Sequence, residues 1–140
     1  MTKSIITKIA ALFIVAVTFT ACNKYEEGSN YSLISKKSRV ANEWKLNRAT
    51  AENSGVTADI TTTLTLSTTK DGTFTRTATI ATIDFAETGN WVFNDDKTSL
   101  IMTDSDGDVF TGTIKKLKSD EMTLVNVDGS TTYTYEYVTK

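Results

Sequence analysis

The chain has no histidine, no proline and only one cysteine, Cys22. Without histidine it cannot build a Ser-His-Asp triad or a zinc site with imidazole ligands. A single cysteine cannot form a disulfide within the chain, so stability has to come from a packed core. No glycine-rich loop of the kind that cradles phosphate is present either. Because proline does not interrupt the apolar segments, long β-strands are permitted.

The apolar run at residues 9–17 is too short to cross a membrane. It reads Ile-Ala-Ala-Leu-Phe-Ile-Val-Ala-Val and follows two lysines, Lys3 and Lys8. A spanning helix needs about 20 apolar residues, whereas a positive stretch followed by a shorter apolar run is typical of a secretion signal. We therefore expect residues 1–21 to be a signal peptide.

The signal ends at Phe19-Thr20-Ala21-Cys22, which resembles the lipobox of bacterial lipoproteins. The resemblance implies that the Cys22 thiol carries diacylglycerol and that cleavage occurs before it. Separately, the sequence shows no cofactor-binding motif, so we predict no cofactor. Two or three acyl chains make a stable anchor where one chain holds only marginally. The alternative is an ordinary secretion signal beside an unrelated cysteine.

The remaining 119 residues are enough for one domain. Two of the 15 basic residues lie in the signal, so this part carries 13 basic and 17 acidic residues, a net charge of −4. That balance argues against binding nucleic acid and against binding anionic lipid by charge. We expect a tether over residues 22–30, a monomeric domain over residues 31–140, and membrane attachment through the lipid on Cys22.

Within the tether, Lys24-Tyr25-Glu26-Glu27 resembles the charged export tags of Bacteroides-type surface lipoproteins. The resemblance implies the outer face of the outer membrane. A merely soluble tether is the alternative, so we expect an outer-membrane lipoprotein on either the periplasmic face or the cell surface.

From residue 43 onward the pattern is typical of β-structure, after a short helix expected within residues 31–42 with Ser32 as its N-cap. Threonine is abundant, and apolar residues alternate with polar ones between turn signals such as Asp71-Gly72 and Asp128-Gly129. Eight strands are expected, at 43–49, 59–68, 72–82, 87–94, 98–104, 108–117, 121–127 and 131–139. Their short connections favour an all-β, eight-stranded antiparallel up-and-down barrel, with a two-sheet sandwich as the alternative.

Several segments resemble the lipocalin-like lipoproteins of Bacteroides-type bacteria, over roughly residues 31–140. They are Glu43-Trp44-Lys45-Leu46, Asp71-Gly72-Thr73-Phe74, Gly89-Asn90-Trp91-Val92-Phe93, Ser99-Leu100-Ile101-Met102, Ile114-Lys115-Lys116-Leu117 and Met122-Thr123-Leu124. The resemblance implies an eight-stranded lipocalin-like barrel and suggests a small apolar ligand.

Acidic residues give no recognisable catalytic arrangement. Asp104, Asp106 and Asp108 resemble the start of a calcium loop, but its sixth and twelfth positions hold Val109 and Lys115. A solvated hairpin turn explains the spacing better. We therefore predict neither an enzyme nor a metal site.

The candidate ligand-binding residues are those expected to point into the barrel. They are Trp44, Phe74, Arg76, Trp91, Phe93, Phe110, Tyr133 and Tyr135. These side chains either line a pocket for a small apolar or amphipathic molecule or fill the barrel, leaving protein or glycan to bind the outer face and loops. A closed, dry, aromatic-lined cavity of about 300 Å³ or more would favour the first hypothesis, whereas an interior packed solid by Trp44, Phe74 and Trp91 would exclude a carrier of this kind and favour the second.

Overall fold

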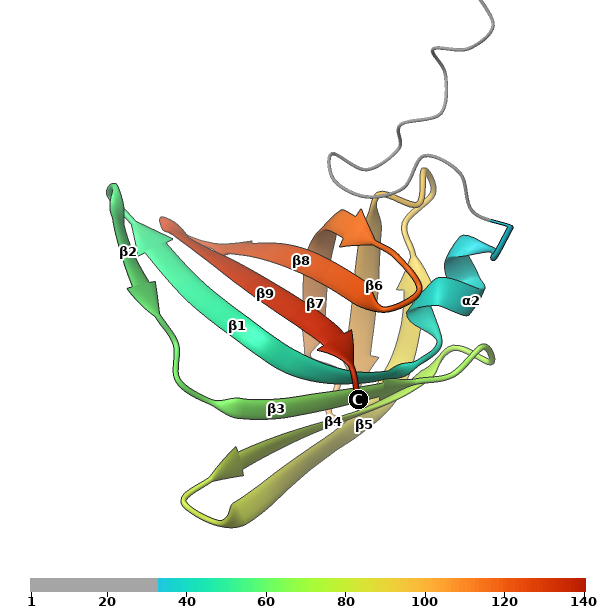
Figure 1. Cartoon of the computed structure of the whole chain (residues 1–140), viewed down its shortest axis with the longest axis horizontal. Helices are drawn as coiled ribbons and strands as arrows, with labels where there is room; N and C mark the ends of the chain where they lie inside the picture. The colour runs from blue at the N-terminus through green and yellow to red at the C-terminus, as the bar shows by residue number, and fades with distance from the viewer. Residues whose placement is uncertain (1–32) are drawn as a thin grey trace, which may run out of the picture.

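The computed structural model describes residues 33–140, which form an all-β domain (Figure 1). One short helix, α2 (Lys36–Val40), precedes nine strands. The strands are β1 (Glu43–Asn53), β2 (Val56–Asp59), β3 (Thr63–Thr68), β4 (Thr73–Ile80), β5 (Ile83–Phe93), β6 (Ser99–Asp104), β7 (Val109–Leu117), β8 (Glu121–Asp128) and β9 (Thr131–Thr139). The predicted signal peptide, Cys22, the tether and the predicted N-cap Ser32 lie outside the described residues.

Eight of the strands close into an antiparallel barrel, as the sequence predicts. Neighbours pair in the order β1-β3-β4-β5-β6-β7-β8-β9, and β9 pairs back to β1 from Trp44↔Thr139 to Asn53↔Thr131. The ninth strand, β2, forms a hairpin with the second half of β1. It occupies the same edge of β1 whose first half pairs with β3. The simple up-and-down order expected from the sequence does not include this strand.

The two ends of the barrel are built differently (Figure 1). One end holds α2 and the β3–β4, β5–β6 and β7–β8 turns, and we call it the helix end. The opposite end holds the tips of the β1–β2, β4–β5, β6–β7 and β8–β9 hairpins, and we call it the mouth. Figure 1 shows the β4–β5 hairpin projecting away from the rest of the barrel at the mouth.

The hydrophobic core fills the interior toward the helix end, and we call this part the base. Alternation along the strands points one apolar row inward, which is the pattern that predicted the strands. A bulge between Leu46 and Arg48 shifts the inward row of β1, so that Ala49 is buried after Leu46. The buried apolar residues are Val40, Trp44, Leu46, Ala49, Leu66, Phe74, Trp91, Leu100, Met102, Ile114, Leu117, Met122, Leu124 and Tyr137.

Helix α2 closes the base. It is shorter than the predicted segment of residues 31–42 and begins at the N-cap Ser35, whose hydroxyl accepts a hydrogen bond from the Ser38 amide at 3.1 Å. Val40 at its C-terminal end is fully buried, and its carbonyl accepts the indole N–H of Trp44 at 2.8 Å. The Arg39 guanidinium reaches across to the Leu117 carbonyl. These contacts tie the helix to opposite walls of the barrel.

Candidate functional site

An ion pair lies above the base, where the barrel interior changes from apolar to polar. Arg76 on β4 and Glu87 on β5 are direct cross-strand partners. The Arg76 Nε donates to Glu87 Oε2 at 3.0 Å, and its Nη2 bonds the same oxygen. The Arg76 side chain is 30% exposed and that of Glu87 is 48% exposed, so water screens the pair, which contributes little to stability.

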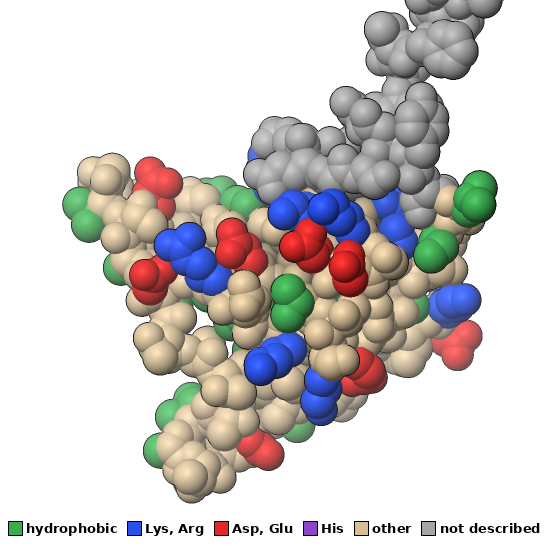
Figure 2. Space-filling model, viewed as in Figure 1, with side chains coloured by type: hydrophobic (Ala, Val, Ile, Leu, Met, Phe, Trp, Pro, Cys, Tyr) green, Lys and Arg blue, Asp and Glu red, His purple; other side chains and the backbone are tan. Residues whose placement is uncertain are grey.

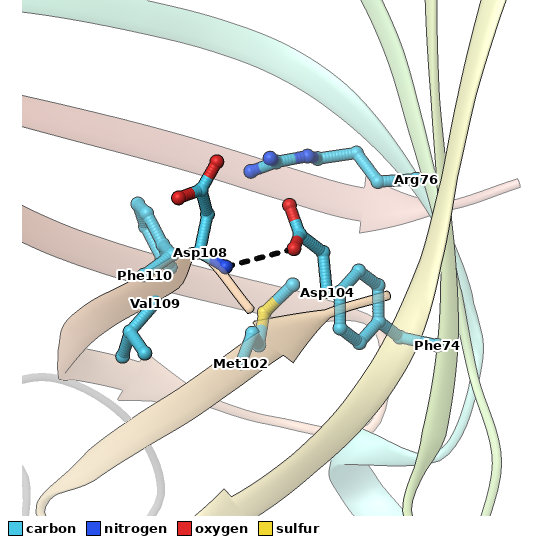
Figure 3. A pocket seen from close by; sticks show the side chains of 7 residues that line it. All are labelled: Phe74, Arg76, Met102, Asp104, Asp108, Val109 and Phe110. Carbon is cyan, nitrogen blue, oxygen red and sulfur yellow. Dashed lines mark hydrogen bonds between the residues drawn. The ribbon is translucent and has the colours of Figure 1, made fainter. Parts of the chain in front are cut away.

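Beside this pair lies a cavity of about 120 Å³. Figure 3 shows the Arg76 guanidinium directed across it toward the carboxylates of Asp104 and Asp108. The cavity is lined by Phe74, Arg76, Met102, Asp104, Asp108, Val109 and Phe110. Its apolar floor and charged rim can receive a polar group, but it is smaller than the roughly 300 Å³ of sites that enclose a whole ligand.

Aromatic rings extend the wall of this cavity around the barrel. Phe110 on β7 contacts Tyr135 on β9 edge to face at 5.9 Å, and Tyr135 stacks on Tyr133 at 6.5 Å between ring centroids. The Arg76 guanidinium lies 6.0 Å from the centre of the Phe110 ring. Burial raises the pKa of Tyr135. These rings offer a flat apolar surface beside a fixed charge.

The inner face of the β4–β5 hairpin continues toward the hairpin tip as an apolar wall that residues 33–140 leave largely exposed. Ile80, Ile83 and Phe85 share the inward register with Arg76 and Glu87, yet they are 61, 60 and 54% exposed. Val56, in the inward register at the tip of β2, is 70% exposed. Figure 2 shows hydrophobic side chains at the tips of both hairpins. This wall, together with the cavity and the aromatic rings, forms the candidate site.

A second, more open cavity of about 350 Å³ lies in the barrel wall, where β1 leaves β3 and joins β2. The Arg48–Asp59 ion pair crosses it at 3.1 Å, and both side chains are well exposed. Its lining is mostly polar and contains no aromatic ring: Leu46, Asn47, Arg48, Ala49, Asp59, Ile60, Thr61 and Thr62. It offers less apolar surface than the mouth, so the mouth is the stronger candidate.

The structure divides the predicted ligand-binding residues into two groups. Trp44 and Trp91 are buried in the base, where the Trp91 indole N–H donates to the Thr69 carbonyl at 3.0 Å, and Phe93 packs edge to face on Trp91. These three residues line neither cavity, and we assign them to the core. Phe74, Arg76 and Phe110 line the first cavity, with Tyr133 and Tyr135 beside it.

The sequence interpretation missed the apolar wall because it placed residues 81–86 partly in the preceding strand and partly in a connection. The turn here is Ala81-Thr82, and both residues have positive φ, at 49° and 79°. Neither residue type is a turn signal. The signal that could have revealed the wall is the alternation of Ile80, Ile83 and Phe85 with polar or small residues on either side of a two-residue turn.

The acidic turn at residues 104–108 is the solvated hairpin turn that the spacing predicts. Asp104 Oδ1 accepts hydrogen bonds from the backbone N–H groups of Asp106 and Asp108, both at 2.9 Å. Within residues 33–140, no three side chains of the metal-binding kinds gather into a group that could hold an ion. Through Asp104 and Asp108, the turn shapes the rim of the first cavity.

No helix within residues 33–140 has the length and hydropathy needed to cross a membrane. No family model, curated protein or solved structure matches this chain. The resemblance to lipocalin-like lipoproteins is therefore a prediction from sequence alone, and the geometry of the mouth is the structural basis for a functional proposal.

Proposed function

We propose that this chain is a non-enzymatic, lipid-anchored protein of the cell envelope whose barrel mouth binds a small amphipathic molecule. The observation that supports this proposal best is the uncovered apolar wall of the β4–β5 hairpin. Large apolar side chains in an inward register are normally buried, but Ile80, Ile83 and Phe85 are more than half exposed. Contiguous exposed apolar surface next to a polar rim is a common property of ligand-binding grooves.

The energetics favour an amphipathic ligand over a purely apolar one. Full burial of an Ile or Phe side chain contributes about 1.5–3 kcal/mol, so covering this half-exposed wall yields a useful part of a binding free energy. The cavity beside it is polar at its rim, through Arg76, Asp104 and Asp108, and at about 120 Å³ it has room for a head group only. An aliphatic or aromatic tail would lie on the wall while the head entered the cavity.

The membrane part of the proposal rests on the signal and on Cys22. The apolar run at 9–17 and the lipobox-like Ala21-Cys22 favour lipidation and attachment to the outer membrane. Incorporation of radiolabelled palmitate into the native chain, and its loss in Cys22→Ser, would test this part. The absence of histidine and of a recognisable nucleophile–base arrangement supports a binding role over an enzymatic one.

Binding at the mouth is tested with a fluorescent amphiphile, 11-(dansylamino)undecanoic acid. The test variant is Ile83→Ser/Phe85→Ser, which makes the wall polar. The control variant is Val92→Ser/Val127→Ser, because these two valines are 57 and 65% exposed but lie in the outward register. We expect the wall variant to bind at least about tenfold more weakly, a loss of about 1.4 kcal/mol.

The control should stay within about twofold of the native chain. The proposal would be contradicted if both variants bound the probe equally more weakly than the native chain. It would also be contradicted if the native chain showed no saturable binding of the probe. That result would favour the alternative, a surface interaction module that contacts protein or glycan through its outer face and loops. Displacement of the probe by lauric acid and by dodecylamine shows which head-group charge the rim prefers.

A further inference from the structure

Charge is unevenly divided between the two ends of the barrel. Because the strands are antiparallel, the start of β1 and the turns around α2 lie at one end, and the hairpin tips lie at the other. Ten of the twelve lysines and arginines among residues 33–140 belong to the helix end. They are Lys36, Lys37, Arg39, Lys45, Lys70, Lys97, Lys115, Lys116, Lys118 and Lys140.

The acidic residues are distributed the other way. Six lie at the helix end: Glu43, Asp71, Asp95, Asp96, Asp120 and Glu121. Seven lie at the mouth: Glu52, Asp84, Glu87, Asp104, Asp106, Asp108 and Asp128. Arg76 is the one basic residue described at the mouth, and Arg48, Asp59 and Glu136 lie midway along the strands. The side chains therefore give the helix end a net charge of +4 and the mouth a net charge of −6.

The described chain also begins at the helix end, with two exposed apolar side chains. Leu33 is fully exposed and Ile34 is 47% exposed, immediately before α2. Only ten residues lie between Cys22 and Leu33, so eleven steps of the chain join them. Fully extended, that length of chain spans about 36–40 Å at most, so a lipid on Cys22 would keep the start of the helix end within this distance of the membrane.

We propose that the helix end docks on an anionic phospholipid surface, with the ligand-binding mouth turned away from the membrane. The proposal rests on the lipid anchor proposed above, which would keep the domain near the membrane. It adds which face of the domain contacts the membrane. Lysines and arginines near an anionic leaflet are attracted to it, and Leu33 and Ile34 can enter the head-group region beside the lysines. The acidic mouth would be repelled by the same surface.

This proposal differs from what the net charge of the whole mature chain predicts. The net charge of −4 over residues 22–140 argues against attraction to anionic lipid, but that sum averages over the two ends and the tether. Electrostatic attraction is screened over about 8–10 Å at physiological salt, so a surface responds mainly to the charges on the face it meets. The local charge of +4 at the helix end is therefore the relevant quantity.

The test separates docking from anchoring by removing the lipid. The mature chain, residues 22–140 with Cys22→Ser, is sedimented with vesicles of phosphatidylcholine alone or mixed with phosphatidylglycerol. The helix-end variant is Lys37→Gln/Lys45→Gln/Lys70→Gln, which neutralises three exposed lysines. The control, Thr57→Glu/Ala86→Glu/Ser105→Glu, makes the same change in net charge at exposed positions of the mouth half.

We expect binding to the phosphatidylglycerol vesicles only, and a loss of that binding between about 0.1 M and 1 M salt. The helix-end variant should bind more than tenfold more weakly, and the control should stay within about twofold of its parent. Equal weakening of both variants, or no preference for the anionic vesicles, would overturn the proposal. Failure of palmitate labelling at Cys22 would refute the anchor instead, and failure of the dansyl probe the mouth site, so the three claims fail separately.

Discussion

The base and the mouth are built from the same strands but have opposite character. In the base, inward side chains from opposite walls meet under α2, and residues such as Trp44 and Met122 are fully buried. At the mouth, the β4–β5 hairpin projects beyond its neighbours, and inward residues such as Ile83 and Phe85 are more than half exposed. The difference shows that inward register alone does not bury a side chain; a facing element is also needed.

The largest expected effect compares one aromatic residue from each region. Trp44→Ala removes a fully buried indole and its hydrogen bond to the Val40 carbonyl, which should cost about 3–5 kcal/mol of unfolding free energy. Phe85→Ala removes a ring that is 54% exposed and should cost less than about 1 kcal/mol. Urea unfolding of both variants checks this. Similar losses in the two would mean that the wall is packed as tightly as the base.

Gly89 lies at the boundary of the two regions, where β5 first pairs with β6. A Cβ at this position would lie 2.0 Å from the Thr103 carbonyl oxygen, which is backbone and cannot move aside easily. We expect Gly89→Ala to cost about 3 kcal/mol. Gly112→Ala is the control, because its nearest contact is a Phe110 ring carbon at 3.0 Å, and it should be milder in the same unfolding experiment.

The tip of the β4–β5 hairpin carries backbone strain at two consecutive residues, Ala81 and Thr82. Thr82 has a φ of 79°, a conformation that a β-branched residue rarely adopts. Thr82→Gly should therefore stabilise the protein by about 1 kcal/mol. Ala86→Gly, in regular strand on the same hairpin, should destabilise it slightly. Thermal unfolding distinguishes the two, and a lower melting temperature for Thr82→Gly would show that the turn is unstrained.

Of these substitutions, Tyr137→Phe in the base is expected to change the unfolding free energy least at neutral pH. Burial strongly raises the pKa of its phenol from the ordinary value of 10.0. The neutral form is therefore favoured by folding, so its contribution is fully present below pH 10 and is lost as the pH rises above it. Tyr137→Phe should reduce this alkaline loss of stability. Tyr133→Phe, at the mouth, should leave the alkaline loss of stability unchanged. Unfolding free energies of both variants, measured from pH 8 to 12, would test this difference.

Much of the fold could be predicted because period-2 alternation is a local signal. The inward rows around Trp44, Leu66, Phe74 and Leu124 follow directly from it, as does the Asp106-Gly107 hairpin turn. Closure into a barrel followed from short connections and from the need to pair both edges. These features depend on residues close together in the chain, so one sequence is enough to find them.

The rest depends on where strands end relative to one another. The Ser54-Gly55 turn, with both residues at positive φ, creates β2 and was overlooked, although Ser-Gly is a turn signal. The unusual Ala81-Thr82 turn sets how far the β4–β5 wall projects. An inward aromatic residue lines the site when it lies near the mouth, as Phe110 does, and fills the core when it lies near the helix end, as Trp91 does. Alternation shows that a residue points inward but not how far along the barrel axis it lies.

The most direct test of the central claim is an amide NMR titration of the mature chain with lauric acid and, separately, with dodecylamine, because the side chains of the mouth carry a net charge of −6. Binding at the mouth predicts saturable shifts confined to the β4–β5 hairpin and the neighbours of Arg76 and Phe110, with the amides around Trp44 and Trp91 unchanged. Shifts centred on the packed base or on the outer threonine-rich face, or no saturable shifts at all, would contradict it.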